Sequence, residues 1–457
     1  MKCGKANDNE AVAEIKGHWY FAAGTLFGVA GLLLWETLSG KRGFSPHLIR
    51  GSREDPDIPG AVIVPGLLGS ELRQPDGREA WLNSGNALGY HDLRLPMKLP
   101  LRESRDTLVA GGLIGADTVL PRLFGFTEYA DILELLHAAG FHRDARPGGA
   151  RGAVHHVFTY DWRRDLVESA EALGQALDAR ADERGDPDAR FNVIAHSMGG
   201  LVARYYLRYG GAEPGGPVTW AGARRIHNLV LVATPSGGSI PALEAILTGN
   251  RVGLSSTTLA ADVIARMPSL YQLLPPRGTS PLVNAAAEPL DVDLHSPKLW
   301  EERGWGPWRP GSKGSEQDFT AAMLERAGAF HAALARTPGS ACPVRVVALG
   351  GDCLPTRTRA LVSEKRGVLP RGEPRTRNEA DVMFEAGDGR VTRSSVLASH
   401  LPGASRSVFG SGIAEVDHAF FAAVDHHGIY TEPAFQSLLL RMLLQPVARR
   451  TAEALGD

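Results

Sequence analysis

The sequence contains few of the residues and patterns that would assign it to several common classes of protein. Only three cysteines occur in 457 residues, Cys3, Cys342 and Cys353, which is too few for a disulfide framework. A single bridge between Cys342 and Cys353 stays open. The 49 Lys and Arg residues nearly balance the 51 Asp and Glu residues, so the net charge of −2 gives no reason to expect nucleic-acid binding. The chain also lacks a glycine-rich phosphate loop and the ligand spacing of a metal site. We therefore expect no cofactor, no metal and no nucleic-acid partner.

Apolar runs of the β type alternate with helical patterns between residue 58 and about residue 450. Such alternation is typical of an α/β domain in which helices flank a mostly parallel central sheet. The predicted strands are residues 61–64, 154–159, 191–195, 228–233, 344–349 and 417–424.

One serine lies where a predicted strand passes into a predicted helix. Ser197 follows the apolar run 191–195 and precedes Gly199. The segment 201–209 is apolar on one face, as a helix packed on a sheet requires. A nucleophile elbow holds a serine hydroxyl on such a tight turn, and small residues must flank it for steric reasons. Ala195 replaces the first glycine of the usual Gly-x-Ser-x-Gly pattern and is still small. Ser197 is therefore the candidate nucleophile.

A nucleophilic serine needs a histidine to take its proton and an acid to orient that histidine. In the α/β-hydrolase arrangement both residues follow the serine in the chain, with the acid first. Asp352 directly follows the strand-like run 344–351, whereas Asp388 lies between Gly387 and Gly389. We predict that Asp388 is the acid, because glycines on both sides allow a sharp turn whose amides can hold a carboxylate.

The histidines that compete for the role of base are His400, His418, His426 and His427. A base must project from a loop at the end of a strand, and a β-rich stretch ends at Val424, just before His426. We predict that His426 is the base, with its neighbour His427 as the alternative. His418 and His400 are more typical of partly buried or surface histidines.

Two backbone amides would have to bind the oxyanion that forms when an ester is attacked. One belongs to the residue after the nucleophile, Met198, and the other comes from an earlier strand-to-loop turn. The buried run 60–64 leads into Pro65 and Gly66, so the amide of Leu67 can point at the site. A donor of this kind typically contributes about 3 kcal/mol to transition-state stabilisation.

Several unlike motifs occur in the order found in the lecithin:cholesterol acyltransferase family, which the chain resembles over about residues 60–445. They are residues 62–72 (VIVPGLLGSEL), 81–83 (WLN), 160–163 (YDWR), 195–199 (AHSMG), 235–239 (PSGGS), 268–275 (PSLYQLLP) and 387–391 (GDGRV). The resemblance implies an α/β-hydrolase fold with a phospholipid as acyl donor. By matching position it implies Ser197, Asp388 and His426 as the triad, and the amides of Leu67 and Met198 as the oxyanion donors. Two positions depart from the family pattern, since Leu67 replaces a more polar residue and Arg390 replaces the threonine of Gly-Asp-Gly-Thr-Val.

The motif at residues 160–163 ends one predicted strand and precedes a helical pattern. We interpret Asp161 and Arg163 as an ion pair that fixes loops at the base of the site, with Trp162 filling space beneath them. The alternative is that the indole of Trp162 lines a pocket for the acyl chain or head group.

Two long insertions and an apolar N-terminal segment complete the predicted organisation. Within the domain at residues 58–450, the insertions at about 70–125 and 240–340 are expected to form cap or lid elements. Apolar residues of the second insertion, such as Leu270 and Trp300, either meet lipid or pack against the hydrolase core.

Residues 17–35 carry no formal charge when His18 is neutral, and they have a tryptophan near each end. They predict an uncleaved membrane anchor within residues 17–40, after an N-terminal tail at 1–16. The alternative is a short apolar helix packed on the domain.

The sequence therefore predicts a serine-dependent O-acyltransferase or lipase associated with a membrane surface. The enzyme would cleave a lipid ester, with phospholipid as the expected class, through an acyl-enzyme and pass the acyl group to a lipid alcohol or to water. Two other hypotheses stay open: a catalytically silent membrane-associated scaffold of the same fold, and an esterase for small esters.

Overall fold

The computed structural model describes residues 58–81, 92–114, 128–143, 153–252, 255–399, 405–407, 410–413 and 415–444. The predicted N-terminal tail and anchor at residues 1–40 lie outside these ranges, and so does His400. Among the helices of the described ranges, none combines the length and the apolar character needed to cross a membrane. The anchor and the membrane association therefore stay predictions.

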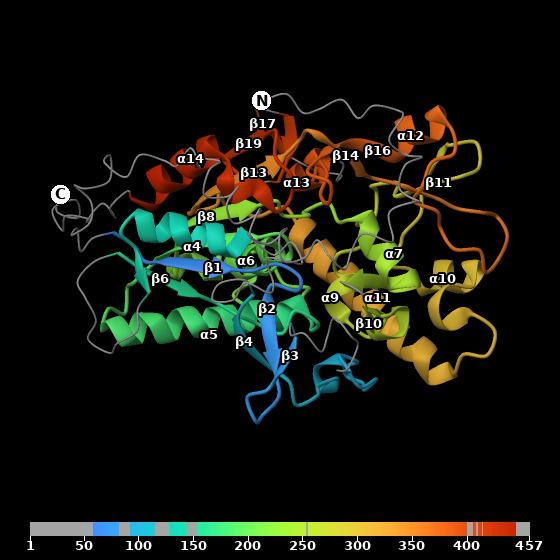
Figure 1. Cartoon of the computed structure of the whole chain (residues 1–457), viewed down its shortest axis with the longest axis horizontal. Coiled ribbons are helices and arrows are strands. Elements are labelled where there is room, and N and C mark those ends of the chain that lie inside the picture. The colour runs from blue at the N-terminus through green and yellow to red at the C-terminus, as the bar shows by residue number, and fades with distance from the viewer. Residues whose placement is uncertain are drawn as a thin grey trace, which may run out of the picture. The chain divides into compact units, whose positions relative to one another are not determined.

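Within the described residues, a seven-stranded parallel sheet forms the centre of the fold (Figure 1). Its strands, in spatial order, are β19 (His418–Ala422), β13 (Arg345–Gly351), β8 (Ile226–Val232), β7 (Phe191–His196), β1 (Ala61–Val64), β6 (Val154–Val157) and β5 (His142–Arg143). Six of them match predicted strands to within a few residues. The seventh, β5, is only two residues long and too short to give a periodic pattern. The predicted α/β class is confirmed.

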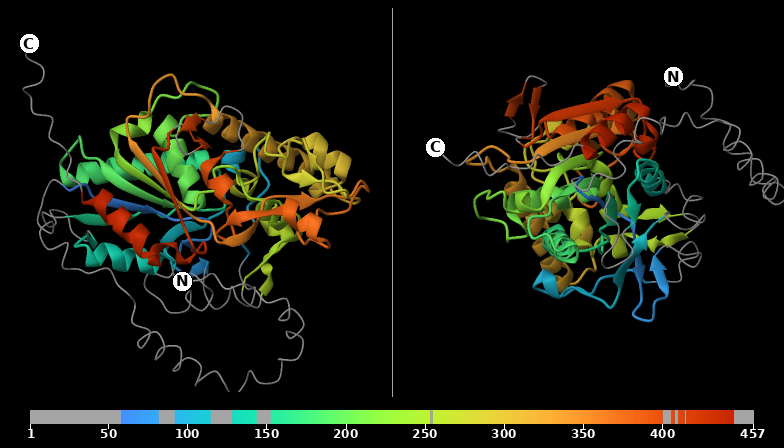
Figure 2. Two further views of the ribbon diagram at one scale, coloured as in Figure 1. Left: turned by 90° about the horizontal axis from the view of Figure 1, so that it is seen from above. Right: turned by 90° about the vertical axis from the view of Figure 1, so that its left-hand side faces the viewer.

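Helices cover both faces of this sheet, which explains why its strands read as continuous apolar runs. Helices α5 (Leu166–Arg184) and α6 (Met198–Tyr209) lie on one face, and α4 (Glu128–Ala138) and α14 (Pro433–Leu443) lie on the other (Figure 2). All six residues of β7 are buried between these layers.

The boundaries of α5 follow from its capping residues. The Asp165 side chain accepts a hydrogen bond from the amide of Val167, which satisfies one of the free donors in the first turn. The helix ends where Gly185 adopts the left-handed conformation, with φ of 64°, which glycine tolerates without steric cost.

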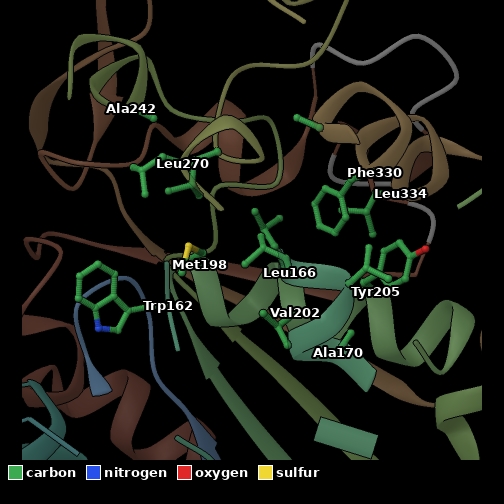
Figure 3. Close-up of a cluster of buried hydrophobic side chains, with 14 of the residues drawn as sticks. Trp162, Leu166, Ala170, Met198, Val202, Tyr205, Ala242, Leu270, Phe330 and Leu334 are labelled. Carbon is green, nitrogen blue, oxygen red and sulfur yellow. The ribbon is translucent and has the colours of Figure 1, made fainter. Parts of the chain in front are cut away.

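The insertion between β8 and β13 folds into a layer of helices over the carboxyl end of the sheet, and all of them except α11 are short. Its elements are α7 (Ile240–Thr248), β9 (Asn250–Val252), β10 (Ser255–Leu259), α8 (Ala261–Ile264), α9 (Pro268–Tyr271), β11 (Leu282–Val283), β12 (Pro289–Leu290), α10 (Pro297–Arg303) and α11 (Gly314–Ala335). Figure 3 shows side chains of α7, α9 and α11 facing those of α5 and α6. Phe330 of α11 stacks on Tyr205 of α6, with ring centroids 5.3 Å apart.

The apolar residues of this insertion pack inside the protein, so the interpretation that they meet lipid is wrong for them. Leu270, Leu274, Trp300 and Trp305 are all buried, as part of the same apolar cluster as α5 and α6. Burying a large apolar side chain stabilises the fold by about 1.5–3 kcal/mol, which favours packing over exposure to solvent.

The motif at residues 268–275 fastens the insertion to the start of α5. The Ser269 hydroxyl donates to the carbonyl oxygen of Trp162 at 2.6 Å. The Gln272 side chain accepts from the amide of Leu166 at 2.8 Å and donates to Asp165 at 2.7 Å. Because these bonds are buried, they hold the insertion at one place on the α/β core.

Smaller sheets surround the central one. They are β2 (Ser70–Arg73) with β3 (Glu79–Trp81) and β4 (Val109–Leu113), β15 (Ala360–Leu361) beside β11, β14 (Leu354–Arg357) with β16 (Phe384–Gly387), and β17 (Ser405–Ser407) with β18 (Gly410–Gly412). Two further helices, α12 (Arg377–Met383) and α13 (Arg393–Leu397), flank β16 in the chain.

Arg163 ties the first insertion to the domain, in agreement with the structural interpretation of residues 160–163. Its guanidinium, which is fully buried, donates to both carboxylate oxygens of Asp161 and to both of Asp106, at 2.7–2.9 Å. The neighbouring Trp162 is also buried and meets Trp81 edge-on, with ring centroids 5.6 Å apart.

We expect Arg163→Ala to lower the free energy of unfolding by about 3–5 kcal/mol, because two carboxylates would lose their shared buried partner. Urea denaturation measures this loss. Arg78→Ala serves as the control, because it removes an exposed ion pair to Asp76 and should leave the urea concentration at the midpoint of unfolding unchanged. Equal midpoints for the Arg163 variant and the wild type would contradict the structural role.

The bridge between Cys342 and Cys353 is absent, since neither sulfur forms a disulfide. The Cys342 thiol donates to the carbonyl oxygen of Val344, and burial raises its pKa to about 11. Neither cysteine therefore links the elements around β13.

Candidate active site

Ser197 occupies a strained turn between β7 and α6, as the elbow motif predicts. Its backbone angles are φ 51° and ψ −125°, a conformation that is costly for a residue with a side chain. Glycines make room on both sides of it. A Cβ at Gly66 would lie 2.8 Å from the Ser197 Cβ, and a Cβ at Gly199 would lie 2.4 Å from the carbonyl oxygen of Pro65. The motif thus allows the loop after β1 to pass directly over the elbow.

The structure brings Ser197, His426 and Asp388 into one chain of hydrogen bonds. The Nε2 atom of His426 lies 3.2 Å from the Ser197 hydroxyl. The Nδ1 atom of His426 lies 2.8 Å from a carboxylate oxygen of Asp388. The serine and the histidine are 229 residues apart in the sequence. The three side chains therefore have the order and spacing that a serine–histidine–aspartate triad requires.

The Asp388 carboxylate is buried and held by backbone amides, as its glycine-flanked position predicts. It accepts from the amides of Arg390 at 2.8 Å and Val391 at 2.7 Å. Gly389, with φ of 89°, makes the turn that aims these amides. Arg390 contributes only its backbone to these contacts, so the departure from the family's threonine leaves the carboxylate in place.

The surroundings of Asp388 keep it ionised. Burial raises the pKa of the carboxyl, but the facing His426 and the amides of Val391 and Arg390 lower it more. The pKa therefore lies below its ordinary value of 3.8. An ionised carboxylate holds the proton of His426 on Nδ1 and leaves Nε2 free to accept the serine proton.

Asp388 does not follow a strand of the central sheet. It follows β16, which pairs antiparallel with β14 in a separate two-stranded sheet. This excursion returns the chain to the end of β13, where a Cβ on Gly351 would lie 2.8 Å from that of Asp388. The competing residue, Asp352, lies next to Gly351 but points to Arg393 at 3.5 Å and is partly exposed.

The competing histidines of the described residues do not bond to Ser197. His427 is adjacent to the base, but its amide donates to Asp425, and its ring meets that of His426 edge-on. His418 is an exposed residue of β19. Of the described candidates, only His426 lies within hydrogen-bonding distance of Ser197.

The predicted oxyanion donors flank the elbow. Met198 is the first residue of α6, and the first amides of a helix have no acceptor within it. Leu67 follows Gly66, the residue packed against Ser197. The loop that carries Leu67 is held by the Tyr160 hydroxyl, which donates to the carbonyl oxygen of Pro65 at 2.9 Å.

The loop with the motif at residues 235–239 is fastened to the element after Asp388. The amide of Gly237 donates to the carbonyl oxygen of Ser395 at 2.8 Å, and the Ser395 hydroxyl donates to that of Gly238 at 2.6 Å. Ser395 belongs to α13, which begins five residues after Asp388. These bonds support the turn that carries the acid.

Two residues near the site were missed by the sequence analysis. The hydroxyl of Tyr129, on α4, lies 3.0 Å from Nδ1 of His196, the residue before Ser197. Tyr129 comes from a part of the chain without a motif, and His196 was seen only as part of the elbow. No sequence signal pairs them.

The parallel sheet, the strained elbow at Ser197 and the order of the three polar residues define an α/β-hydrolase fold. In sequence, residues 109–300 match the family described as Lecithin:cholesterol acyltransferase. The match confirms, over those residues, the resemblance drawn from the motifs. None of the curated proteins matches the sequence significantly.

Solved structures align with this chain at low sequence identity. A chain of the Tle4–Tli4 complex aligns with a TM-score of 0.53 and 15% identity, covering 84% of this chain and 98% of that one. The mature lipase BlEst2 of Bacillus licheniformis aligns with a TM-score of 0.35 and 12% identity over 84% and 93% of the two chains. For lipase 1 from Pelosinus fermentans the values are 0.32 and 10%, over 85% and 99%.

Proposed function

We propose that this protein is a serine-dependent lipid-ester acyltransferase or lipase that works through an acyl-enzyme. The hydrogen-bond chain from Ser197 through His426 to Asp388 carries this proposal. The match to the lecithin:cholesterol acyltransferase family supports a lipid ester as substrate, with phospholipid as the class we expect.

Ser197, His426 and Asp388 each have a defined part in the proposed reaction. As the Ser197 oxygen attacks the ester carbonyl, His426 Nε2 takes its proton, and Asp388 stabilises the imidazolium that forms. The amides of Leu67 and Met198 donate to the oxygen that becomes negative. His426 then returns the proton to the leaving alcohol, and the acyl group stays on Ser197.

The second half of the reaction repeats these roles with a new nucleophile. An alcohol or a water molecule loses its proton to His426 Nε2 and attacks the acyl-enzyme carbonyl. The same two amides bind the second oxyanion, and His426 returns its proton to the departing Ser197 oxygen. The choice between alcohol and water depends on how far the cap excludes water from the acyl-enzyme.

Product analysis on phosphatidylcholine vesicles tests this function, with and without cholesterol or diacylglycerol in the bilayer. We expect a lysophospholipid together with either free fatty acid, which indicates a hydrolase, or a new ester, which indicates a transferase. Ser197→Ala serves as the blank. Folded protein that turns over neither these vesicles nor a p-nitrophenyl ester would contradict the proposal.

Membrane association through residues 17–40 forms part of the same proposal. Vesicle sedimentation of the full chain and of a chain without residues 1–40 tests it. We expect the shorter chain to lose binding, and equal binding of both chains would refute the anchor.

A further inference from the structure

Two buried side chains beneath the candidate site have no part in the mechanism above. Tyr129, on α4, is 1% exposed, and His196, the last residue of β7, is 2% exposed. They lie between the loop after β1 and the loop that carries His426. His196 is also bonded covalently to Ser197, so this pair contacts three segments that must stay in register for the reaction.

The contacts of the pair form a hydrogen-bond chain with one direction. The amide of Gly66 donates to the Tyr129 hydroxyl at 2.8 Å. That hydroxyl lies 3.0 Å from Nδ1 of His196, and Nε2 of His196 lies 3.4 Å from the carbonyl oxygen of His426. A carbonyl can only accept, so Nε2 of His196 carries the proton. In a neutral imidazole the other ring nitrogen is an acceptor, so with this tautomer the Tyr129 hydroxyl donates to Nδ1 of His196.

The two ends of this chain are backbone groups of the catalytic loops. One end is the amide of Gly66, directly before the predicted oxyanion donor Leu67. The other end is the carbonyl of His426, the predicted base. Ring packing reinforces the second contact, because the ring centroid of His196 lies 4.9 Å from that of His426 and 5.9 Å from that of Tyr430.

We propose that Tyr129 and His196 are positioning residues that hold the base loop and the oxyanion loop at a fixed separation across Ser197. This inference rests on the proposed function, since it assigns His426 and Leu67 their catalytic roles. The His426 Nε2 to Ser197 distance of 3.2 Å depends on where the His426 backbone lies. A shift of about 1 Å in such a contact can lower the rate about 100-fold.

Three variants test the chain, and fluorophosphonate labelling of Ser197 reads out its reactivity. Tyr129→Phe removes the central hydroxyl and keeps the ring. His196→Asn keeps an acceptor near the Nδ1 position but is too short to reach the His426 carbonyl, whereas His196→Gln can still donate to it. We expect Tyr129→Phe and His196→Asn to lower the labelling rate and kcat by about 10- to 100-fold with KM little changed. His196→Gln keeps the donor to the His426 carbonyl but loses the acceptor that faces Tyr129, so it should lose about as much of both rates as Tyr129→Phe does.

A double variant tests whether the two residues act as one unit. Tyr129→Phe combined with His196→Asn should be no slower than His196→Asn alone, because either change interrupts the same chain. Tyr209→Phe is the matched control. Its buried hydroxyl also donates to a backbone carbonyl, that of Ala333 at 2.7 Å, but far from the site. It should lower the melting temperature about as much as Tyr129→Phe does and leave kcat unchanged.

The outcomes distinguish failure of the proposed function from failure of the positioning role alone. If the wild type is not labelled, the proposed function itself is wrong. If the wild type is labelled and Tyr129→Phe reacts at the same rate, the positioning role is wrong and the triad stands. Wild-type rates in His196→Asn, or additive effects in the double variant, would likewise reduce both residues to ordinary packing.

Discussion

Replacing Ser197 with alanine should lower kcat on a lipid ester by about a millionfold, the loss expected when the nucleophile of a serine triad is removed. The acyl-enzyme cannot form without the Ser197 oxygen, and only oxyanion binding and substrate positioning remain. Labelling with a fluorophosphonate and turnover of phosphatidylcholine measure the effect. Folding should be unaffected, because alanine fits wherever serine does.

Control variants at other serine and histidine residues test whether the loss of activity is specific to Ser197 and His426. Ser437→Ala removes a hydroxyl on α14 that donates to the Pro433 carbonyl, and it should label like the wild type. His426→Ala should lose about as much activity as Ser197→Ala. His427→Ala should lose little, because the Asp425 turn is held by the backbone amide of residue 427. Retained labelling of Ser197→Ala would remove this residue from the mechanism.

Asp388→Asn should lower kcat by about 10,000-fold without disturbing the geometry of the site. The asparagine amide would present a donor to Nδ1 of His426, so the imidazole would adopt the other tautomer and carry its proton on Nε2. In that state it cannot accept the proton of Ser197. Asp352→Asn alters the competing, partly exposed carboxylate and should leave kcat within about twofold. Similar losses in both variants would contradict the assignment of the acid.

The same variant tests how Asp388 affects stability in acid. Its pKa in the folded protein lies below the ordinary value of 3.8, so the unfolded chain binds the proton first as the pH falls. The stability that the ionised carboxylate contributes is therefore present above about pH 4 and is lost as the pH drops through the folded pKa. Urea denaturation should show the difference between wild type and Asp388→Asn constant at neutral pH and shrinking in acid. A difference that does not change with pH would argue against the depressed pKa.

Local patterns near Ser197 were enough to predict much of the candidate site. The elbow is readable because its geometry demands small residues at 195 and 199 and an apolar strand before them. The acid is readable because a glycine-flanked turn supplies free amides, and those of Arg390 and Val391 are the ones that bind it. Both are local constraints, contained within a few consecutive residues.

The choice of His426 over His427 depended on contacts from distant segments. The amide of His426 donates to the carbonyl oxygen of Asp388, and Asp425 accepts from the amides of residues 427 and 428. These bonds set the rotation of the loop and turn one ring of the pair toward Ser197. Adjacent histidines are equivalent until such contacts exist, so the sequence could only rank them.

The sequence could not determine whether the apolar residues of the second insertion are exposed or buried. Its leucines and tryptophans read equally well as a lipid-facing surface or as a buried layer, because both need apolar side chains. In the folded chain they are buried, and Gln272 and Ser269 bind the insertion to residues at and just before the start of α5. Apolar character is a property of each residue, whereas exposure depends on what the rest of the chain places against it.

The amino-acid sequence by itself determined the parallel α/β sheet, the elbow at Ser197 and the turn around Asp388, since each depends on side-chain periodicity or on steric limits within a few residues. Only the tertiary structure decided which histidine faces the serine, how the acid arrives from a separate two-stranded sheet, and that Tyr129 and His196 lie beneath both loops. The physical reason is distance along the chain. Hydrogen bonds between residues 63 to 230 positions apart form only after the sheet has assembled, and no local pattern encodes their partners.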